Sequence, residues 1–287
     1  MPEKIAVIGL GMLGTSLCAA LGGKGYERRV WSRRPEVGKW ALENGIADHI
    51  CGSVEEALEE SDIAILCLPI PTILEFIKEY APFMKKTLVT DIGSVKGCIE
   101  KAALENGIRF VGSHPMAGTE KSGPEAMVPD IYENASVFVV PSAASPEEDT
   151  VRVERLWKSI GAKPCRISAQ EHDLLVAHTS HVPHIVSSAL ALSVLDADGE
   201  LKEKRFAGCA SGFRDTIRVA ASSPKMWREI LSHNREAVLE AMAAYEERCA
   251  RLKQMIADGD FDAFEREFAK GKCLIEEWRK ARNILSK

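Results

Sequence analysis

The stretch IAVIGLGMLGTSLCAALGG, residues 5–23, decides how the first half of this chain folds. It has no charged side chain and approaches the length of a membrane-spanning helix. Its glycines argue against one continuous helix, because each glycine destabilises a helix interior by about 1 kcal/mol relative to alanine. Gly9, Gly11 and Gly14 have the spacing G-x-G-x-x-G. The pattern predicts a buried strand, a phosphate-binding turn and a helix, rather than a membrane anchor or a cleaved signal peptide.

The residues that follow complete a strand-helix-strand unit. A second strand, RRVWS at 28–32, comes at the distance expected for a right-handed crossover. In this context Gly9 permits the tight turn, Gly11 lets backbone amides approach a pyrophosphate, and Gly14 lets the helix pack on the strand. We therefore expect a dinucleotide to bind here. The expected contacts are Gly9, Gly11, Met12, Leu13 and Gly14.

The end of the second strand bears on the choice of dinucleotide. NAD sites usually carry Asp or Glu there for the ribose 2'-hydroxyl, whereas this chain has Ser32, Arg33 and Arg34. Hydroxyl and guanidinium groups suit a 2'-phosphate, which predicts NADP, with NAD as the alternative. Two exposed arginines that merely begin a surface helix would give the same sequence, so both interpretations stay open.

Strands and helices alternate through the first half of the chain. The apolar run DIAILCLP at 62–69 is typical of a strand buried on both faces of a parallel sheet. From about Ser168 the pattern is helical nearly to the end. We therefore expect an α/β chain with a Rossmann-type doubly wound domain at 1–167, followed by an all-α domain at 168–287.

Composition narrows the classes of partner. A net charge of −5 over 287 residues gives no basic footprint for nucleic acid or an anionic membrane, so we expect a small-molecule partner. Eight scattered cysteines without a C-x-x-C pair are typical of reduced thiols in a cytoplasmic protein. His178, His181 and His184 fan across a helix face without a convergent cysteine or carboxylate, so we expect no metal.

The segment GSHPMAGTEKSG at 112–123 is unusual for a structural loop. It follows the carboxyl end of an expected strand, where open α/β sheets bind ligands. His114 in this position can act as a general base, because a neutral imidazole accepts a hydroxyl proton near physiological pH. Its pKa is expected near the reference value of about 6.5. A turn histidine fixed by Pro115 would be the preferred interpretation if the segment stood alone.

Three further motifs accompany it: DIGSVKG at 91–97, SHVPH at 180–184 and GFRDTIRVAASSPKMW at 212–227. In order and spacing, these motifs and the glycine loop resemble the prephenate and arogenate dehydrogenases of tyrosine biosynthesis. The resemblance covers nearly the whole chain. It implies a Rossmann domain, a helical substrate and dimerisation domain, and an active site between them.

The resemblance also implies roles for individual residues. His114 matches the catalytic histidine, and Ser94 matches the serine that bonds to that histidine and to the substrate hydroxyl. Arg218 matches the arginine that holds a substrate carboxylate, and His184 matches a second substrate-contacting histidine. The other positions implied to contact substrate are Thr119, Glu120 and Arg214.

The implied activity is oxidative decarboxylation of prephenate, arogenate or both, with hydride transfer to NAD(P). The products would be 4-hydroxyphenylpyruvate or tyrosine. Apolar stripes at 184–195 and 226–256 further predict a homodimer. A β-hydroxyacid dehydrogenase is the alternative enzyme, but it needs a lysine on the first long helix of the second domain, and 168–195 has none. A cofactor-binding regulator without turnover is the alternative from another class.

Overall fold

The computed structural model describes residues 1–118, 121 and 123–281. The chain divides into two compact units, Met1–Val238 and Leu239–Lys287. This division falls within a long helix, whereas the sequence predicts a domain boundary at 167/168, which stays a prediction.

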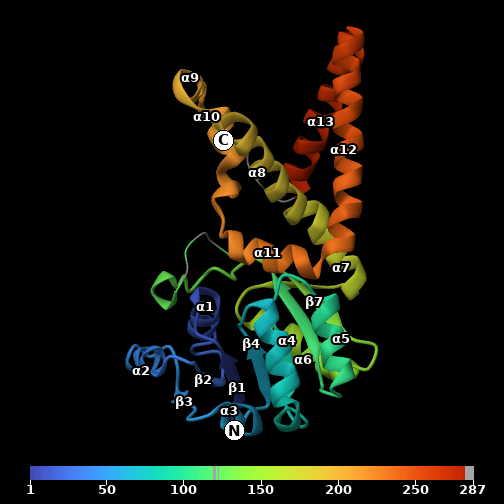
Figure 1. Cartoon of the computed structure of the whole chain (residues 1–287). Helices are drawn as coiled ribbons and strands as arrows, with labels where there is room; N and C mark the ends of the chain where they lie inside the picture. Colours follow the sequence, from blue (N-terminus) through green and yellow to red (C-terminus); the bar gives the residue numbers. More distant parts are fainter. Residues whose placement is uncertain (119–120, 122, 282–287) are drawn as a thin grey trace. The chain divides into compact units, whose positions relative to one another are not determined.

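Five parallel strands form the main sheet of the first unit, in the spatial order β3-β2-β1-β4-β5 (Figure 1). The central strand β1 pairs with β2 on one side and β4 on the other. The strand order reverses between β1 and β4, and open α/β sheets bind ligands outside the carboxyl ends of the strands at such a point. The predicted Rossmann-type fold is therefore confirmed. The strands are β1 Glu3–Ile8, β2 Tyr26–Trp31, β3 His49–Ile50, β4 Ile63–Leu66 and β5 Leu88–Asp91.

Both faces of this sheet are buried, which explains the uninterrupted apolar runs in its strands. Ile5 and Val7 of β1 belong to one hydrophobic core, together with residues of α1, α2 and α6. Ala6 and Ile8 point the other way and pack with α3, α4 and α5. The helices are α1 Met12–Ala20, α2 Pro35–Glu43, α3 Val54–Glu59, α4 Ile70–Tyr80, α5 Gly97–Glu105 and α6 Glu147–Ser159.

A three-stranded sheet continues from β5 through a parallel bridge between Val89 and Phe110. Its strands are β6 Val111–Pro115, β7 Ser136–Pro141 and β8 Lys163–Arg166. β6 runs antiparallel to β7 and places His114 opposite Phe138. The first four residues of the segment singled out around His114, 112–115, thus lie in β6.

The rest of the first unit is helical, as expected from Ser168 onward. Ser168 and Glu171 form a capping box that starts the first of these helices. A π turn, η3, joins α7 to α8 without a break in the helical backbone. The elements are α7 Ala169–Val176, η3 Ala177–His181, α8 Val182–Leu195, α9 Gly199–Gly208, α10 Ser211–Ile217, η4 Arg218–Ala221, α11 Pro224–His233 and the start of α12 Arg235–Asp258.

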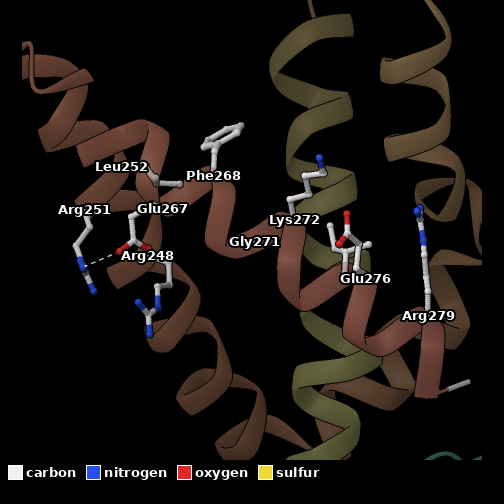
Figure 2. A pocket seen from close by; sticks show the side chains of 10 residues that line it. Arg248, Arg251, Leu252, Glu267, Phe268, Gly271, Lys272, Glu276 and Arg279 are labelled. Atoms are coloured by element: carbon white, nitrogen blue, oxygen red, sulfur yellow. Dashed lines mark hydrogen bonds and ion pairs between the residues drawn. The ribbon is translucent and has the colours of Figure 1, made fainter. Parts of the chain in front are cut away.

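The second unit contains most of α12, and α13, Phe261–Ala281. Gly259, with φ of +71°, allows the turn between these helices. A pocket of about 560 Å³ lies between them, with Arg251 and Glu267 paired at 3.4 Å on its wall (Figure 2). Within the described ranges, no helix has both the length and the apolar character to cross a membrane.

Candidate active site

The three glycines of the first loop meet three different surroundings. Gly9 has a φ of +99°, and a Cβ added there would lie 2.6 Å from the Cys67 carbonyl oxygen. A Cβ on Gly14 would lie 2.1 Å from the Gly9 carbonyl oxygen, whereas one on Gly11 would meet no atom within 4 Å. Gly9 and Gly14 are therefore required by packing, and Gly11 faces open space.

Gly11 is also the N-cap of α1, and it supplies no side chain to bond the first N–H groups of that helix. Helix N-termini with unpaired N–H groups bind phosphate, through both hydrogen bonds and the helix dipole. Met12 and Leu13 form the first turn of this helix. The loop therefore fits a dinucleotide pyrophosphate.

Ser32, Arg33 and Arg34 lie between β2 and α2, so Ser32 follows the strand that the sequence predicts to include it. The Ser32 hydroxyl accepts a hydrogen bond from the Arg34 backbone N–H at 3.2 Å. Both arginines are exposed, and neither forms an ion pair with any described residue. Their guanidinium groups are available to an anion.

His114 is partly buried near the end of β6. Its Nδ1 lies 2.8 Å from Nε2 of His172, and the two rings meet edge to face. Burial, reinforced by His172 and Lys96, lowers the pKa of His114 well below its ordinary value of 6.5. The expectation of a pKa near the reference value is therefore wrong, and the ring is neutral at physiological pH.

A buried ion pair holds the strand beneath His114. Lys96 Nζ contacts the Asp91 carboxylate, and neither side chain is more than 1% exposed. Lys96 Nζ also donates to the Ser113 carbonyl oxygen at 2.8 Å, while Asp91 accepts from the Ser113 N–H at 3.2 Å. Two bonds thus fix the backbone of the residue that precedes His114.

Ser94 lies in the loop between β5 and α5. No hydrogen bond joins it to His114 among the residues described, so the predicted contact stays a prediction. Its neighbour Val95 packs in a small apolar cluster with Trp227 of α11. Trp227 in turn contacts His184, with ring centroids 4.1 Å apart and the ring planes tilted by 34°. The Ser94 loop and the His184 helix therefore meet at one indole ring.

Arg218 is exposed at the start of η4, which packs against α8. Ser187, one turn after His184, donates to the Thr216 carbonyl oxygen at 3.0 Å and ties α8 to the segment that carries Arg218. Arg214 is exposed on α10, and its Nε lies 3.3 Å from Asp215 Oδ1. Both arginines thus lie in the helical part of the first unit.

Thr119 and Glu120 lie outside the described residues. Sequence reasoning missed His172 and Asp173, although the histidines around them were noted. His172 is fully buried between His114 and Asp173. Adjacent His and Asp near a helix start were an available signal, because His-Asp pairs commonly orient a catalytic base.

Among the described residues, one group has the donor types of a metal site: His49, Cys51 and Glu56, with ligand atoms within 4.8 Å of one another. The Arg29 guanidinium lies 3.4 Å from Glu56, and a cation there opposes metal binding. Glu56 is already bonded to His49 at 2.9 Å. These contacts account for the cluster, and the expectation of no metal stays a prediction.

Comparison with known proteins decides the family. Residues 21–165 match the prephenate dehydrogenase nucleotide-binding domain, and residues 168–270 match the prephenate dehydrogenase dimerization domain. The chain belongs to the prephenate dehydrogenase family. Membership of this family favours the prephenate or arogenate dehydrogenase interpretation of the sequence over the β-hydroxyacid dehydrogenase alternative.

Individual relatives of this family resemble the chain over most of their length. A prephenate dehydrogenase of Lactococcus lactis is 35% identical over 94% of this chain and 76% of its own. A cyclohexadienyl dehydrogenase of Zymomonas mobilis is 31% identical over 90% of this chain and 91% of its own. A prephenate dehydrogenase from A. aeolicus, solved with hydroxyphenyl propionate and NAD+, has a TM-score of 0.88 at 29% identity, covering 96% and 98% of the two chains.

Proposed function

We propose that this protein catalyses the NAD(P)-dependent oxidative decarboxylation of prephenate, arogenate or both. The observation that carries the proposal is His114, hydrogen-bonded to His172, in the same compact unit as an open pyrophosphate loop at Gly11. A base and a dinucleotide loop are the two parts that oxidation of an alcohol requires. The relatives named above support the choice of a cyclohexadienyl substrate.

The chemistry follows from the substrate's hydroxyl and ring carboxylate. When bound, the nicotinamide dinucleotide supplies a hydride acceptor. His114 accepts the hydroxyl proton as the C–H electron pair leaves the same carbon, and a carbonyl forms. The ring carboxylate then leaves as CO2, and the electron pair of the broken C–C bond moves through the ring to the carbonyl oxygen. The ring becomes aromatic, and the resulting phenolate takes up a proton. Ser94 binds the hydroxyl, and Arg218 neutralises a carboxylate.

Further proposed substrate contacts are His184, Arg214, Thr119 and Glu120.

A steady-state assay of both substrates, prephenate and arogenate, with both cofactors, NAD and NADP, tests the function. Turnover of either substrate supports it. Cofactor binding without turnover of either would favour a regulator and overturn the proposal.

We propose NADP as the preferred cofactor, with NAD as the alternative. The variant Arg33→Ala/Arg34→Ala is expected to bind NADP about 10- to 100-fold more weakly, because charge-assisted bonds to the 2'-phosphate are lost. NAD affinity should change little. Lys39→Ala, which removes another exposed cation of α2, serves as the control. A parent enzyme that uses NAD better than NADP would refute this assignment.

Arg218→Ala is expected to raise KM about 10- to 100-fold, because a charged hydrogen bond to a carboxylate is lost. An anchor of this kind binds ground and transition states alike, so kcat should stay near its parental value. Steady-state kinetics measure both constants. Lys204→Ala, on the exposed surface of α9, is the matched control. A fall in kcat at unchanged KM would contradict the anchoring role.

We propose that the protein is a cytoplasmic homodimer. The match to a dimerization domain at 168–270 and the exposed apolar side chains of α13, Phe268 and Trp278 among them, support the dimer. Sedimentation at micromolar concentration should give a mass of about twice 31.5 kDa, and a mass of one chain would refute the dimer.

All eight cysteines are free thiols, which supports the proposed cytoplasmic location. Cell fractionation tests this location.

A further inference from the structure

His172 of α7 lies between His114 and the carboxylate of Asp173, and its ring is fully buried. Its Nε2 is 2.8 Å from His114 Nδ1, and its Nδ1 is 2.8 Å from Asp173 Oδ1. Phe138 of β7 closes the third side, edge to face at 5.6 Å between ring centroids. The three polar groups therefore form a continuous line that ends at His114.

Asp173 sets the direction of the hydrogen bonds in this line. Its Oδ1 accepts from the Lys96 backbone N–H and its Oδ2 from the Gly97 backbone N–H, both at 2.8 Å. These N–H groups stand at the start of α5, where the helix dipole favours a negative charge. A carboxylate so placed accepts hydrogen bonds and donates none. The ring proton of His172 must then sit on Nδ1, which leaves a lone pair on Nε2.

That lone pair dictates where His114 carries its own proton. If His114 kept its proton on Nε2, two ring lone pairs would face each other at 2.8 Å, and both groups would lose a hydrogen bond. With the proton on Nδ1, His114 donates to His172 and its Nε2 becomes an acceptor. A general base needs this arrangement, because the accepting nitrogen must be free of hydrogen.

We propose that His172 and Asp173 are positioning residues that hold the neutral ring of His114 as the Nδ1–H tautomer and so present Nε2 to the substrate hydroxyl. The inference rests on the proposed function, in which His114 is the base. In the step itself the hydroxyl proton moves to Nε2 of His114, while the Nδ1 proton stays on His114 and is donated to Nε2 of His172. His114 is then an imidazolium, and the His172 ring lies between it and the Asp173 carboxylate.

A further hydrogen bond, from Asn234, holds Asp173 in place in the absence of substrate. Asn234 Nδ2 donates to the Asp173 carbonyl oxygen at 2.8 Å and lies 3.2 Å from His181 Nδ1. The charged and titratable groups that face the two rings are Lys96 and Asp91 from the sheet side, Asp173 from α7 and His181 from η3. Burial lowers the pKa of His172, so this ring is neutral and carries a single ring proton.

The first test reads the tautomer directly. Long-range ¹H–¹⁵N spectra of the full-length protein, labelled at histidine and recorded near pH 8, separate protonated from lone-pair ring nitrogens. Signals of His114 are assigned by their loss in His114→Asn. We expect hydrogen on Nδ1 of His114 in the parent and a mixed or inverted tautomer in His172→Phe. Hydrogen on Nε2 in the parent, or an unchanged tautomer in His172→Phe, overturns the proposal.

The second test measures catalysis. His172→Phe keeps the ring volume and removes the acceptor, and a wrong tautomer of a catalytic histidine costs up to about 10,000-fold in kcat. We expect a fall in kcat of about 100-fold or more, with KM near its parental value. His172→Gln, whose amide can accept from His114 and donate to Asp173, should recover at least about tenfold of that loss. His178→Phe, an exposed histidine in the same helical segment, is the matched control.

The two tests separate the possible failures. If the parent turns over neither substrate, the proposed function fails, and the spectra still report the tautomer. If the parent is active but His172→Phe keeps full kcat, the inference fails and the proposed function stands. Where His172→Phe does not fold, the parent spectrum and the kinetics of His172→Gln decide, since Nε2–H in the parent overturns the proposal by itself.

Discussion

Replacing His114 with asparagine is expected to lower kcat by about 100- to 10,000-fold, the range that general base catalysis contributes. KM should stay near its parental value, because proton acceptance develops mainly in the transition state. Asparagine is smaller than histidine and polar, so β6 should be retained. Steady-state kinetics and a circular dichroism spectrum together distinguish lost chemistry from lost structure.

The dependence on pH gives the same prediction a second readout. A general base works when neutral, so the rate is constant above its pKa and falls as the pH drops through it. Burial lowers the pKa of His114 well below 6.5, which places the acid limb of kcat/KM below that pH. The limb should vanish in His114→Asn. If the variant keeps full kcat and the same limb, the base lies elsewhere, and His184 becomes the next candidate.

Gly14→Ala is expected to damage the fold, whereas Gly11→Ala should damage cofactor binding alone. The added methyl group of Gly14→Ala would lie 2.1 Å from a backbone oxygen, which the turn cannot move aside without separating α1 from β1. Overpacking in a core commonly costs about 1–3 kcal/mol, and a clash with backbone belongs at or above the upper end. Thermal unfolding without cofactor measures this loss.

Gly11→Ala is the matched control, because its methyl group meets no atom within 4 Å. Its melting temperature without cofactor should equal that of the parent, while its affinity for either dinucleotide falls. Calorimetric titration with NAD and NADP measures that affinity. Equal melting temperatures for Gly14→Ala and the parent, or unchanged dinucleotide affinity in Gly11→Ala, would contradict these roles of the loop.

Local patterns explain why much of the fold was predictable. The glycine spacing requires nearby residues alone, and the buried strands appear as continuous apolar runs because both faces of the sheet are covered. The two-residue strand β3 was missed, since so short a segment has no periodicity to detect. The two compact units also divide at Val238, inside α12, where the helical pattern gives no signal.

The site was predictable in part. His114 was proposed from its place at the end of an expected strand, whereas its partner His172 is 58 residues away and meets it through tertiary packing. The low pKa of His114 has the same origin, because burial and the Lys96 charge arise when β6, α5 and α7 come together. No spacing within one segment encodes such contacts.

The π turn η3 has a consequence for the energetics of binding. Because it keeps the backbone helical, residues 169–195 form one continuous rod from α7 through α8. One end of the rod holds His172 against His114, and further along it Ser187 holds the segment that carries Arg218. The rod therefore contacts both the proposed base, which β6 carries, and the segment that carries the proposed carboxylate anchor, before any substrate arrives. Substrate binding then loses little conformational entropy in ordering the backbone that carries these groups, and more of the interaction energy remains for affinity and orientation.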